Sequence, residues 1–176
     1  MAFGIDFGTT HTVIAYYNEL TNEIIILRLD PFSFTEGTGD SAVHMIPSII
    51  NYIPGEKQGE YDCYIGNQVL EKGMKCSANT MKSMKLYVNS NIDFEKRFKS
   101  ENGLNSIKVS MKRAIKDFLE RVLKLLPEGS LENEQFVFSI PNAEKPRRTS
   151  YPSSLKRPGN SALKESIIWK KAPRRW

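Results

Sequence analysis

The sequence contains few residues of the types that build metal centres and disulfide frameworks. It has two cysteines, Cys63 and Cys76, and two histidines among 176 residues. The cysteines are 13 positions apart, with no second cysteine pair and no histidine near either. A structural zinc site needs four such ligands at short spacings, so this pattern argues against zinc binding. We expect two free thiols in a reducing compartment.

Long hydrophobic runs are also missing. The longest, Ile24 to Leu27, has the length of a strand, whereas a membrane-spanning helix needs about 18 apolar residues or more. The N-terminus has no basic segment followed by an apolar stretch, which is the pattern of a secretory signal. We therefore expect a cytoplasmic protein with no membrane partner. Its 40% of hydrophobic and 26% of charged residues are ordinary for a globular chain.

Acidic residues are scarce only at the end of the chain. The net charge is +5, but residues 152–176 contain seven lysines and arginines against one acid, Glu165. The first 151 residues have 18 basic and 19 acidic residues and are almost neutral. A basic protein raises the hypothesis of nucleic-acid binding, but here the excess belongs to the tail alone. We expect nucleic acid not to be a partner of the main part of the chain.

The first half of the chain predicts strands joined by turns. Its apolar segments are rich in β-branched and aromatic residues, and the connections between the first three are short and polar, which is typical of an antiparallel meander. A loop rich in glycine and small polar residues covers 30–45. The predicted elements, in order, are strands at 2–8, 11–17, 23–29, 47–52 and 61–65, and a short helix at 67–75.

The second half predicts one long amphipathic helix and one buried strand. Apolar residues recur at steps of three and four between 106 and 126, and Pro127 and Gly129 follow. The run QFVFSI at 135–140 then predicts a strand that ends before Pro141. Strands, a helix and a further strand favour an α/β layer in which the last strand is parallel to the first. The apolar positions of the helix are Ile107, Met111, Ile115, Phe118, Val122 and Leu125.

The tail has a different composition. It is rich in proline, serine and basic residues, and it contains both tryptophans. Only 162–169 has the pattern of a short helix. We interpret 149–176 as a disordered or out-of-frame basic tail, and 1–148 as the folded part. In that case the strand at 135–140 is left with an unpaired outer edge.

A carboxylate and a glycine turn stand out near the N-terminus, in the run IDFGTTHT. A turn at Gly8 exposes consecutive backbone N–H groups, and the hydroxyls of Thr9 and Thr10 add donors, so that it can hold phosphate oxygens. Asp6 lies in an apolar strand, where a buried carboxylate needs a partner. It can hold magnesium through the water shell of the ion. The alternative is a plain β-turn with a locally hydrogen-bonded aspartate.

These residues resemble a known family. The run IDFGTTHT is similar to the first phosphate loop of the actin-like ATPases, most closely that of the 70-kDa heat-shock chaperones. Three more segments resemble that family in the same order: IPSII at 46–50, YIG at 64–66 together with 79–87, and FVFSIP at 136–141. The resemblance covers about residues 2–148. It implies a ribonuclease H-like fold of the actin-like ATPase type. Only the first lobe of that fold would be present, and this lobe would be incomplete.

The resemblance implies a site for Mg-ATP. It assigns the nucleotide phosphates to Gly8, Thr9, Thr10 and His11, and the magnesium ion to Asp6. It assigns Lys85 to the γ-phosphate region, as a catalytic residue beside Asp6. An ammonium group there would stabilise charge on the phosphoryl oxygens. Without the resemblance, the sequence favours the interpretation of Lys85 as a solvated helix lysine.

The function implied is that of a chaperone-type ATPase. Its partners would be ATP and ADP, and in the family also unfolded polypeptides and co-chaperones. The family's second phosphate loop and adenosine pocket have no counterpart here, so we expect weak nucleotide binding and negligible turnover. The loss of resemblance after Pro141, with the change in composition, suggests a shifted reading frame or a truncated product. The alternatives are a sugar kinase of the same superfold, and a non-catalytic module with a nucleic-acid-binding tail.

Overall fold

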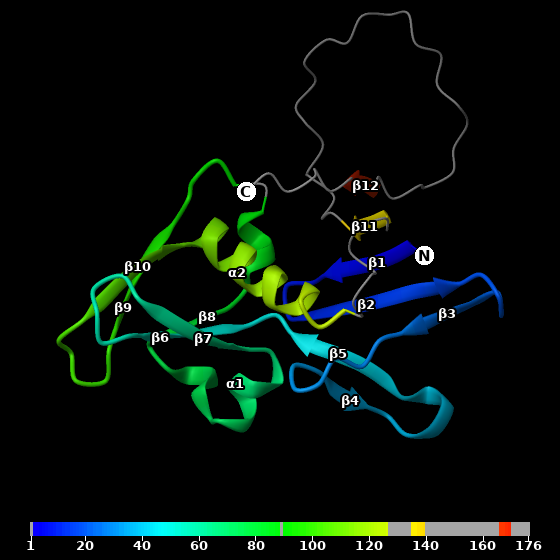
Figure 1. The fold of residues 1–176 in the computed structure, drawn as a ribbon, viewed down its shortest axis with the longest axis horizontal. Coiled ribbons are helices and arrows are strands. Elements are labelled where there is room, and N and C mark those ends of the chain that lie inside the picture. The colour runs from blue at the N-terminus through cyan, green and yellow to red at the C-terminus, as the bar shows by residue number, and fades with distance from the viewer. Residues whose placement is uncertain (1, 89, 127–134, 140–165, 170–176) are drawn as a thin grey trace, which may run out of the picture.

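The fold is a mixed α/β arrangement in which strands predominate. A computed structural model describes residues 2–88, 90–126, 135–139 and 166–169. Figure 1 shows the long helix α2 lying between the N-terminal strands and a second group of strands. The first elements are β1 (Ala2–Phe7), β2 (His11–Asn18), β3 (Glu23–Ile26), β4 (Phe34–Glu36), η1 (Gly39–Ser41), β5 (Val43–Pro47), β6 (Ile50–Pro54) and β7 (Tyr61–Ile65). The others are α1 (Asn67–Glu71), η2 (Met74–Cys76), β8 (Thr80–Met81), η3 (Met84–Tyr87), β9 (Glu95–Lys99), β10 (Ser106–Ser110), α2 (Met111–Leu123), β11 (Gln135–Ser139) and β12 (Ser166–Trp169).

The main sheet has the strand order β12-β11-β1-β2-β5-β4, and β3 also pairs with β2. The predicted meander is confirmed, because β1, β2 and β3 pair antiparallel in sequence order. The predicted parallel strand is confirmed as well. β11 lies beside β1, with Ile5 opposite Phe138, and the rings of Phe3 and Phe136 stack at 5.6 Å between centroids.

The other strands form a three-stranded sheet, β7-β6-β8, and a two-stranded ribbon, β9-β10. Helix α2 packs against both sheets. Phe118 of α2 lies 5.8 Å from Phe7 of β1 between ring centroids, and Asp117 accepts a hydrogen bond from Tyr52 of β6. The ring of Phe98 in β9 stacks on Tyr52 at 4.9 Å. One core therefore joins the sheets, the ribbon and the helix.

The helix prediction at 106–126 is wrong over its first five residues. Residues Ser106–Ser110 form β10, in which Ile107 and Val109 are buried while Lys108 is exposed. This alternation is that of a strand with one buried face. The helix begins at Met111 because Ser110 is its N-cap, and the Ser110 hydroxyl accepts a hydrogen bond from the backbone N–H of Arg113. Pro127 and Gly129 lie outside the described residues.

Three smaller expectations also need correction. The predicted loop at 30–45 contains β4, which pairs with β5 as a hairpin. The predicted strand at 47–52 is divided at Ser48 and Ile49, between β5 and β6. The predicted helix at 67–75 ends at Glu71, because Gly73 takes a left-handed conformation with φ of +66° before η2. The strand at 61–65 is confirmed with the predicted bounds.

The possible short helix at 162–169 is wrong where the structure describes this part of the chain. Residues Ser166–Trp169 form a strand rather than part of a helix at 162–169, and this strand pairs antiparallel with β11. The outer edge of β11, which we expected to be unpaired, is therefore covered. Pro141, 149–165 and 170–176 lie outside the described residues. Within the described part of the chain, no helix is both long and apolar enough to cross a membrane.

Candidate functional site

The glycine turn connects β1 to β2. The ladder between the two strands ends with Phe7 opposite Thr12, which leaves Gly8 to His11 to reverse the chain. A Cβ atom on Gly8 would lie 2.1 Å from the carbonyl oxygen of His11. No side chain fits at that distance, so the tight turn requires glycine at this position. Thr9 and Thr10 at its tip are exposed.

The turn is held in place from the side by the junction between β5 and β6. The backbone N–H of Ser48 donates a hydrogen bond of 2.8 Å to the carbonyl oxygen of Thr10. The hydroxyls of Thr12 and Ser48, both fully buried, lie 2.9 Å apart. The ring of His11 packs on Phe34, with 5.4 Å between the centroids. Residues of β2, of β4 and of the junction between β5 and β6 therefore fix the conformation of the turn.

Asp6 lies on the open face of β1, not among the apolar side chains. Phe3, Ile5 and Phe7 are buried in the core, whereas the side chain of Asp6 is 65% exposed. Because neighbouring residues of a strand point to opposite faces, an aspartate fits between Ile5 and Phe7 without being buried. The expectation of a costly buried carboxylate is therefore wrong, and the strand leaves Asp6 accessible.

Asp6 contacts two groups from distant parts of the chain. The ammonium nitrogen of Lys85 lies 3.5 Å from Asp6 Oδ1, and the hydroxyl of Ser139 donates a hydrogen bond to the same oxygen. Asp6, Lys85 and Ser139 are called the Asp6 cluster below. Among the described residues, neither contact uses Asp6 Oδ2. That oxygen can therefore accept a further bond.

The elements that carry the Asp6 cluster explain how its members meet. β1 and β11 are parallel, and Ile5 lies opposite Phe138. The next residue of each strand, Asp6 and Ser139, therefore lies at the carboxyl end of these two strands. Lys85 belongs to η3, which is held by the fully buried Met84, and its side chain is 17% exposed. Ligands of α/β sheets commonly bind at the carboxyl ends of parallel strands, which is where this cluster lies.

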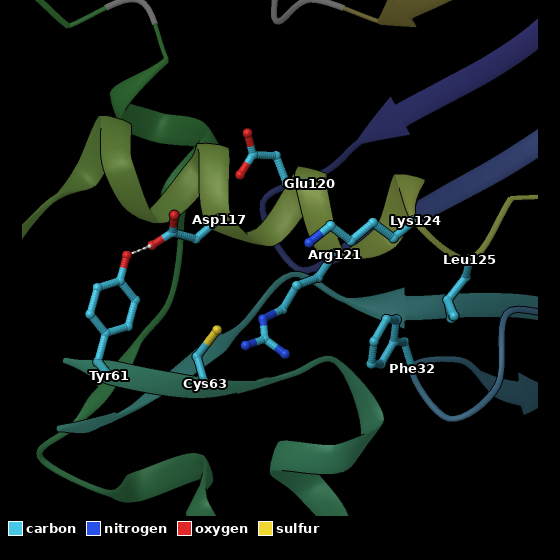
Figure 2. Close-up of a pocket in the computed structure, with 8 residues that line it drawn as sticks. All are labelled: Phe32, Tyr61, Cys63, Asp117, Glu120, Arg121, Lys124 and Leu125. Atoms are coloured by element: carbon cyan, nitrogen blue, oxygen red, sulfur yellow. Dashed lines mark hydrogen bonds between the residues drawn. The ribbon is translucent and has the colours of Figure 1, made fainter. Parts of the chain in front are cut away.

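A pocket lies away from this turn and from Asp6. A cavity of about 430 Å³ opens between α2 and β7, and none of its lining residues is a predicted site residue. Figure 2 shows Arg121 reaching from α2 toward Cys63 of β7. Burial raises the pKa of the Cys63 thiol to about 11, although Arg121 acts in the opposite direction. Cys63 is therefore a neutral thiol at pH 7, and Cys76 is exposed and also free.

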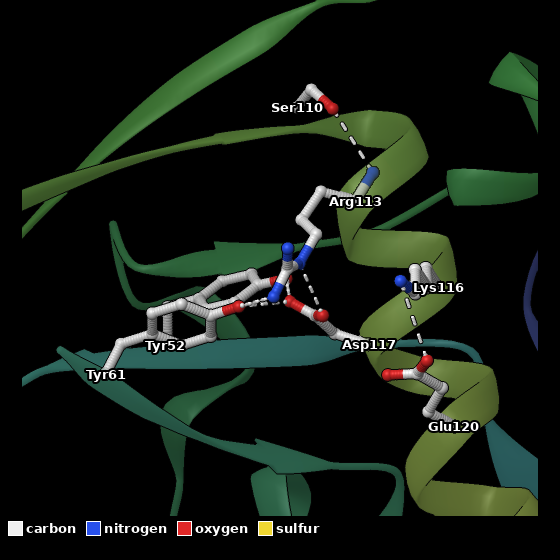
Figure 3. A network of polar contacts seen from close by, with 7 residues as sticks. All are labelled: Tyr52, Tyr61, Ser110, Arg113, Lys116, Asp117 and Glu120. Carbon is white, nitrogen blue, oxygen red and sulfur yellow. Dashed lines mark hydrogen bonds and ion pairs between the residues drawn. The ribbon is translucent and has the colours of Figure 1, made fainter. Parts of the chain in front are cut away.

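A second aspartate lies at one end of this pocket, in the polar network of Figure 3. Asp117 Oδ2 accepts hydrogen bonds of 3.0 Å from the hydroxyls of Tyr52 and Tyr61. Asp117 Oδ1 accepts one of 2.8 Å from Arg113. Burial, and then Asp117, raise the pKa values of both tyrosines. These four residues are called the Asp117 network below.

Comparisons with known proteins do not assign a family. No protein-family model matches the chain, and a search of curated proteins found no related sequence.

Sequence reasoning missed several polar residues that the fold brings together. Ser139 joins Asp6, and Ser48 supports the turn. Ser139 could have been found, because a parallel strand beside β1 places its last residues near Asp6. The Asp117 network gave no such signal, since Asp117 looks like an ordinary polar position of an amphipathic helix. Its burial follows from packing against β6 and β7.

Proposed function

We propose that this protein binds the phosphates of Mg-ATP at the Gly8–His11 turn, as an ATPase of the actin-like type similar to the 70-kDa heat-shock chaperones. The observation that carries the proposal is the contact between Asp6 and Lys85 beside this turn. An acid for the metal and a cation for the phosphates occur together, at the end of parallel strands. The resemblance in sequence had assigned these same residues to the two roles.

The residues fit a magnesium ion and a phosphate chain. Magnesium keeps several waters and is commonly held by one or two carboxylates together with substrate phosphates. Asp6 is an exposed carboxylate of this kind. The described residues contain no group of three or more histidine, cysteine or acidic side chains suited to a metal. Most of the coordination shell would therefore come from phosphate and water.

Each residue has a defined role in the proposed site. The backbone N–H groups and hydroxyls at Thr9 and Thr10 donate to phosphate oxygens, and Gly8 permits the turn. The hydroxyl of Ser139 orients the Asp6 carboxylate. The ammonium of Lys85 stabilises negative charge on the terminal phosphoryl group, which is the main contribution that a protein makes to phosphoryl transfer. Bound magnesium supplies further positive charge at the phosphates.

Isothermal titration calorimetry with Mg-ATP tests the proposal. The sequence has one glycine turn of this kind and no counterpart of the family's second phosphate loop. Because fewer groups then contact the phosphates, we expect a dissociation constant for Mg-ATP weaker than about 1 μM. The Lys85→Met variant removes the ammonium but keeps an unbranched side chain. We expect it to weaken binding at least tenfold, because a charge-assisted contact is worth about 1.5 to 3 kcal/mol.

The matched control is Lys82→Met. Lys82 is an exposed lysine three positions before Lys85, so its removal makes the same change in net charge near the same surface. We expect Lys82→Met to bind Mg-ATP as the wild type does. Equal losses in the two variants, or no binding by the wild type at millimolar nucleotide, would overturn the proposal.

A further inference from the structure

The pocket between α2 and β7 has the features of a small-molecule site. Its volume of about 430 Å³ lies in the range of about 300 to 1,000 Å³ that is typical of such sites. Phe32 and Leu125 line it with apolar surface. Arg121 and Lys124 line it with positive charge, and Figure 2 shows the guanidinium of Arg121 pointing into it from α2. The pocket therefore combines an apolar wall with cations.

The lining of the pocket is itself neutral, with Asp117 and Glu120 against Arg121 and Lys124, but once the ion-pair partners of the acids are counted, one positive charge, that of Lys124, is left over. Each acidic residue at its wall or rim has a cationic partner: Asp117 pairs with Arg113, Glu120 with Lys116, and Asp62 with Arg121. Lys124 makes no ion pair with any described residue. Cys63 adds no negative charge, since its pKa is raised by burial to about 11. An anion is the ligand that this balance favours.

The guanidinium of Arg121 has more hydrogen-bond donors than its contact with Asp62 uses. It carries five N–H groups, of which one on Nη2 donates to Asp62 Oδ1 and another interacts with the thiol of Cys63. The side chain is 36% exposed, so it is partly removed from water. Hydrogen bonds from a guanidinium to a carboxylate are strong and commonly bidentate. A second carboxylate can therefore bind Arg121 from the pocket side while Asp62 keeps its own contact.

We propose that this pocket binds a small organic carboxylate with an apolar body. The carboxylate contacts Arg121 and is attracted by Lys124, and the apolar body packs on Phe32 and Leu125. The site shares no residue with the Gly8–His11 turn, so it is independent of the proposed function. ATP and the carboxylate should bind without competition, and either proposal can fail without the other.

Ligand-observed NMR with benzoate and benzamide tests the proposal. The two probes have the same ring, but only benzoate carries charge. We expect benzoate to bind with a dissociation constant of about 1 mM, as suits a ligand of this size. We expect benzamide to bind at least tenfold more weakly. Equal affinities would overturn the proposal, as would no detectable binding of benzoate.

Two variants test which cations recognise the probe. Arg121→Lys keeps the charge and can still pair with Asp62, but it loses the planar fork, so we expect benzoate to bind about tenfold more weakly. Lys124→Gln should weaken benzoate about two- to threefold, and more at low salt, because Lys124 is exposed. The matched control, Lys112→Gln, removes an exposed lysine of the same helix that does not line the pocket. An equal effect of all three variants would contradict the proposal.

Alkylation of Cys63 gives a second measurement that does not depend on the NMR signals of benzoate. Cys63 lines the pocket, whereas Cys76 is exposed and reacts first, so the experiment uses the Cys76→Ser background. Because Cys63 is 3% exposed and its pKa is raised to about 11, the reaction with iodoacetamide is slow and is followed at pH 9. Saturating benzoate should slow it severalfold, whereas Mg-ATP should not change it. Unchanged alkylation at a benzoate concentration that saturates the NMR signal would place benzoate outside this pocket and overturn the proposal.

Discussion

Asp6 and Asp117 are both aspartates beside a cation, yet their surroundings differ in kind. The side chain of Asp117 is 9% exposed, and both of its oxygens accept hydrogen bonds from the protein. Asp6 is 65% exposed, and its two partners among the described residues share one oxygen. A buried acid that is fully hydrogen-bonded stabilises the fold but has no site left for a ligand. An exposed acid with a spare oxygen contributes little to stability and can bind one.

Solvation explains this difference. Burying a carboxylate costs several kcal/mol unless hydrogen bonds and a counter-charge replace its water shell. The Asp117 network supplies two hydroxyls and a guanidinium for that purpose. Lys85 and Ser139 do less for Asp6, because water still solvates most of its side chain. We therefore expect substitutions of Asp117 to lower the stability of the fold, and substitutions of Asp6 to weaken ligand binding with little effect on stability.

The largest expected effect is that of Asp117→Ala. It leaves the hydroxyl of Tyr52, which is 0% exposed, without an acceptor, and it removes the partner of Arg113. We expect the free energy of unfolding to fall by about 3 kcal/mol, as is usual when a buried polar pair is broken. Urea denaturation measures this loss. A fall below about 0.5 kcal/mol would show that the network is not structural.

The next effect is a loss of stability at alkaline pH. Burial and Asp117 raise the pKa of Tyr52 above its ordinary value of 10.0, and burial raises that of Cys63 from 9.0 to about 11. The folded protein then holds protons that the unfolded chain releases. The stabilisation is complete below about pH 9 and is lost as the pH rises through 9 to 11, by up to about 1.4 kcal/mol per pH unit for each proton.

Urea denaturation at pH 8, 9, 10 and 11 measures this dependence, with Tyr52→Phe as the comparison variant. Tyr52→Phe removes a titrating group of the network but keeps the ring that stacks on Phe98. We expect the variant to lose less stability than the wild type between about pH 10 and 11. Identical pH profiles would mean that the Tyr52 proton is not held by the network.

Much of the fold follows from local sequence patterns. Alternating apolar residues and the tight turn at Gly8 predict the first strands, and the run QFVFSI predicts β11 beside β1. The start of α2 could not be predicted in the same way. Ile107 and Met111 are four residues apart, which suits a helix, but Ile107 and Val109 also alternate as in a strand. Only the pairing of β10 with β9 decides between these two periods.

Less of the candidate site could be predicted from the sequence. The turn carries its own signal, since glycine and hydroxyl residues follow an acid. The meeting of Asp6 with Lys85 has no local signal and was expected only from the resemblance to a family. The network around Asp117 and the pocket beside it were not predicted at all. Both depend on how α2 packs against β7, and that packing is set by the tertiary fold.

The smallest expected effect on stability is that of Asp6→Asn, and it tests the comparison most directly. An exposed ion pair contributes about 0 to 1 kcal/mol, so we expect the free energy of unfolding to change by less than about 0.5 kcal/mol. The same variant should lose the magnesium dependence of ATP binding, because the amide is a poorer ligand for this ion. Asp117→Asn, the matched change in the buried network, should lower stability but leave that dependence intact. A loss of stability in Asp6→Asn as large as that in Asp117→Asn would make Asp6 a structural residue, and the case for a phosphate site at the turn would lose its main support.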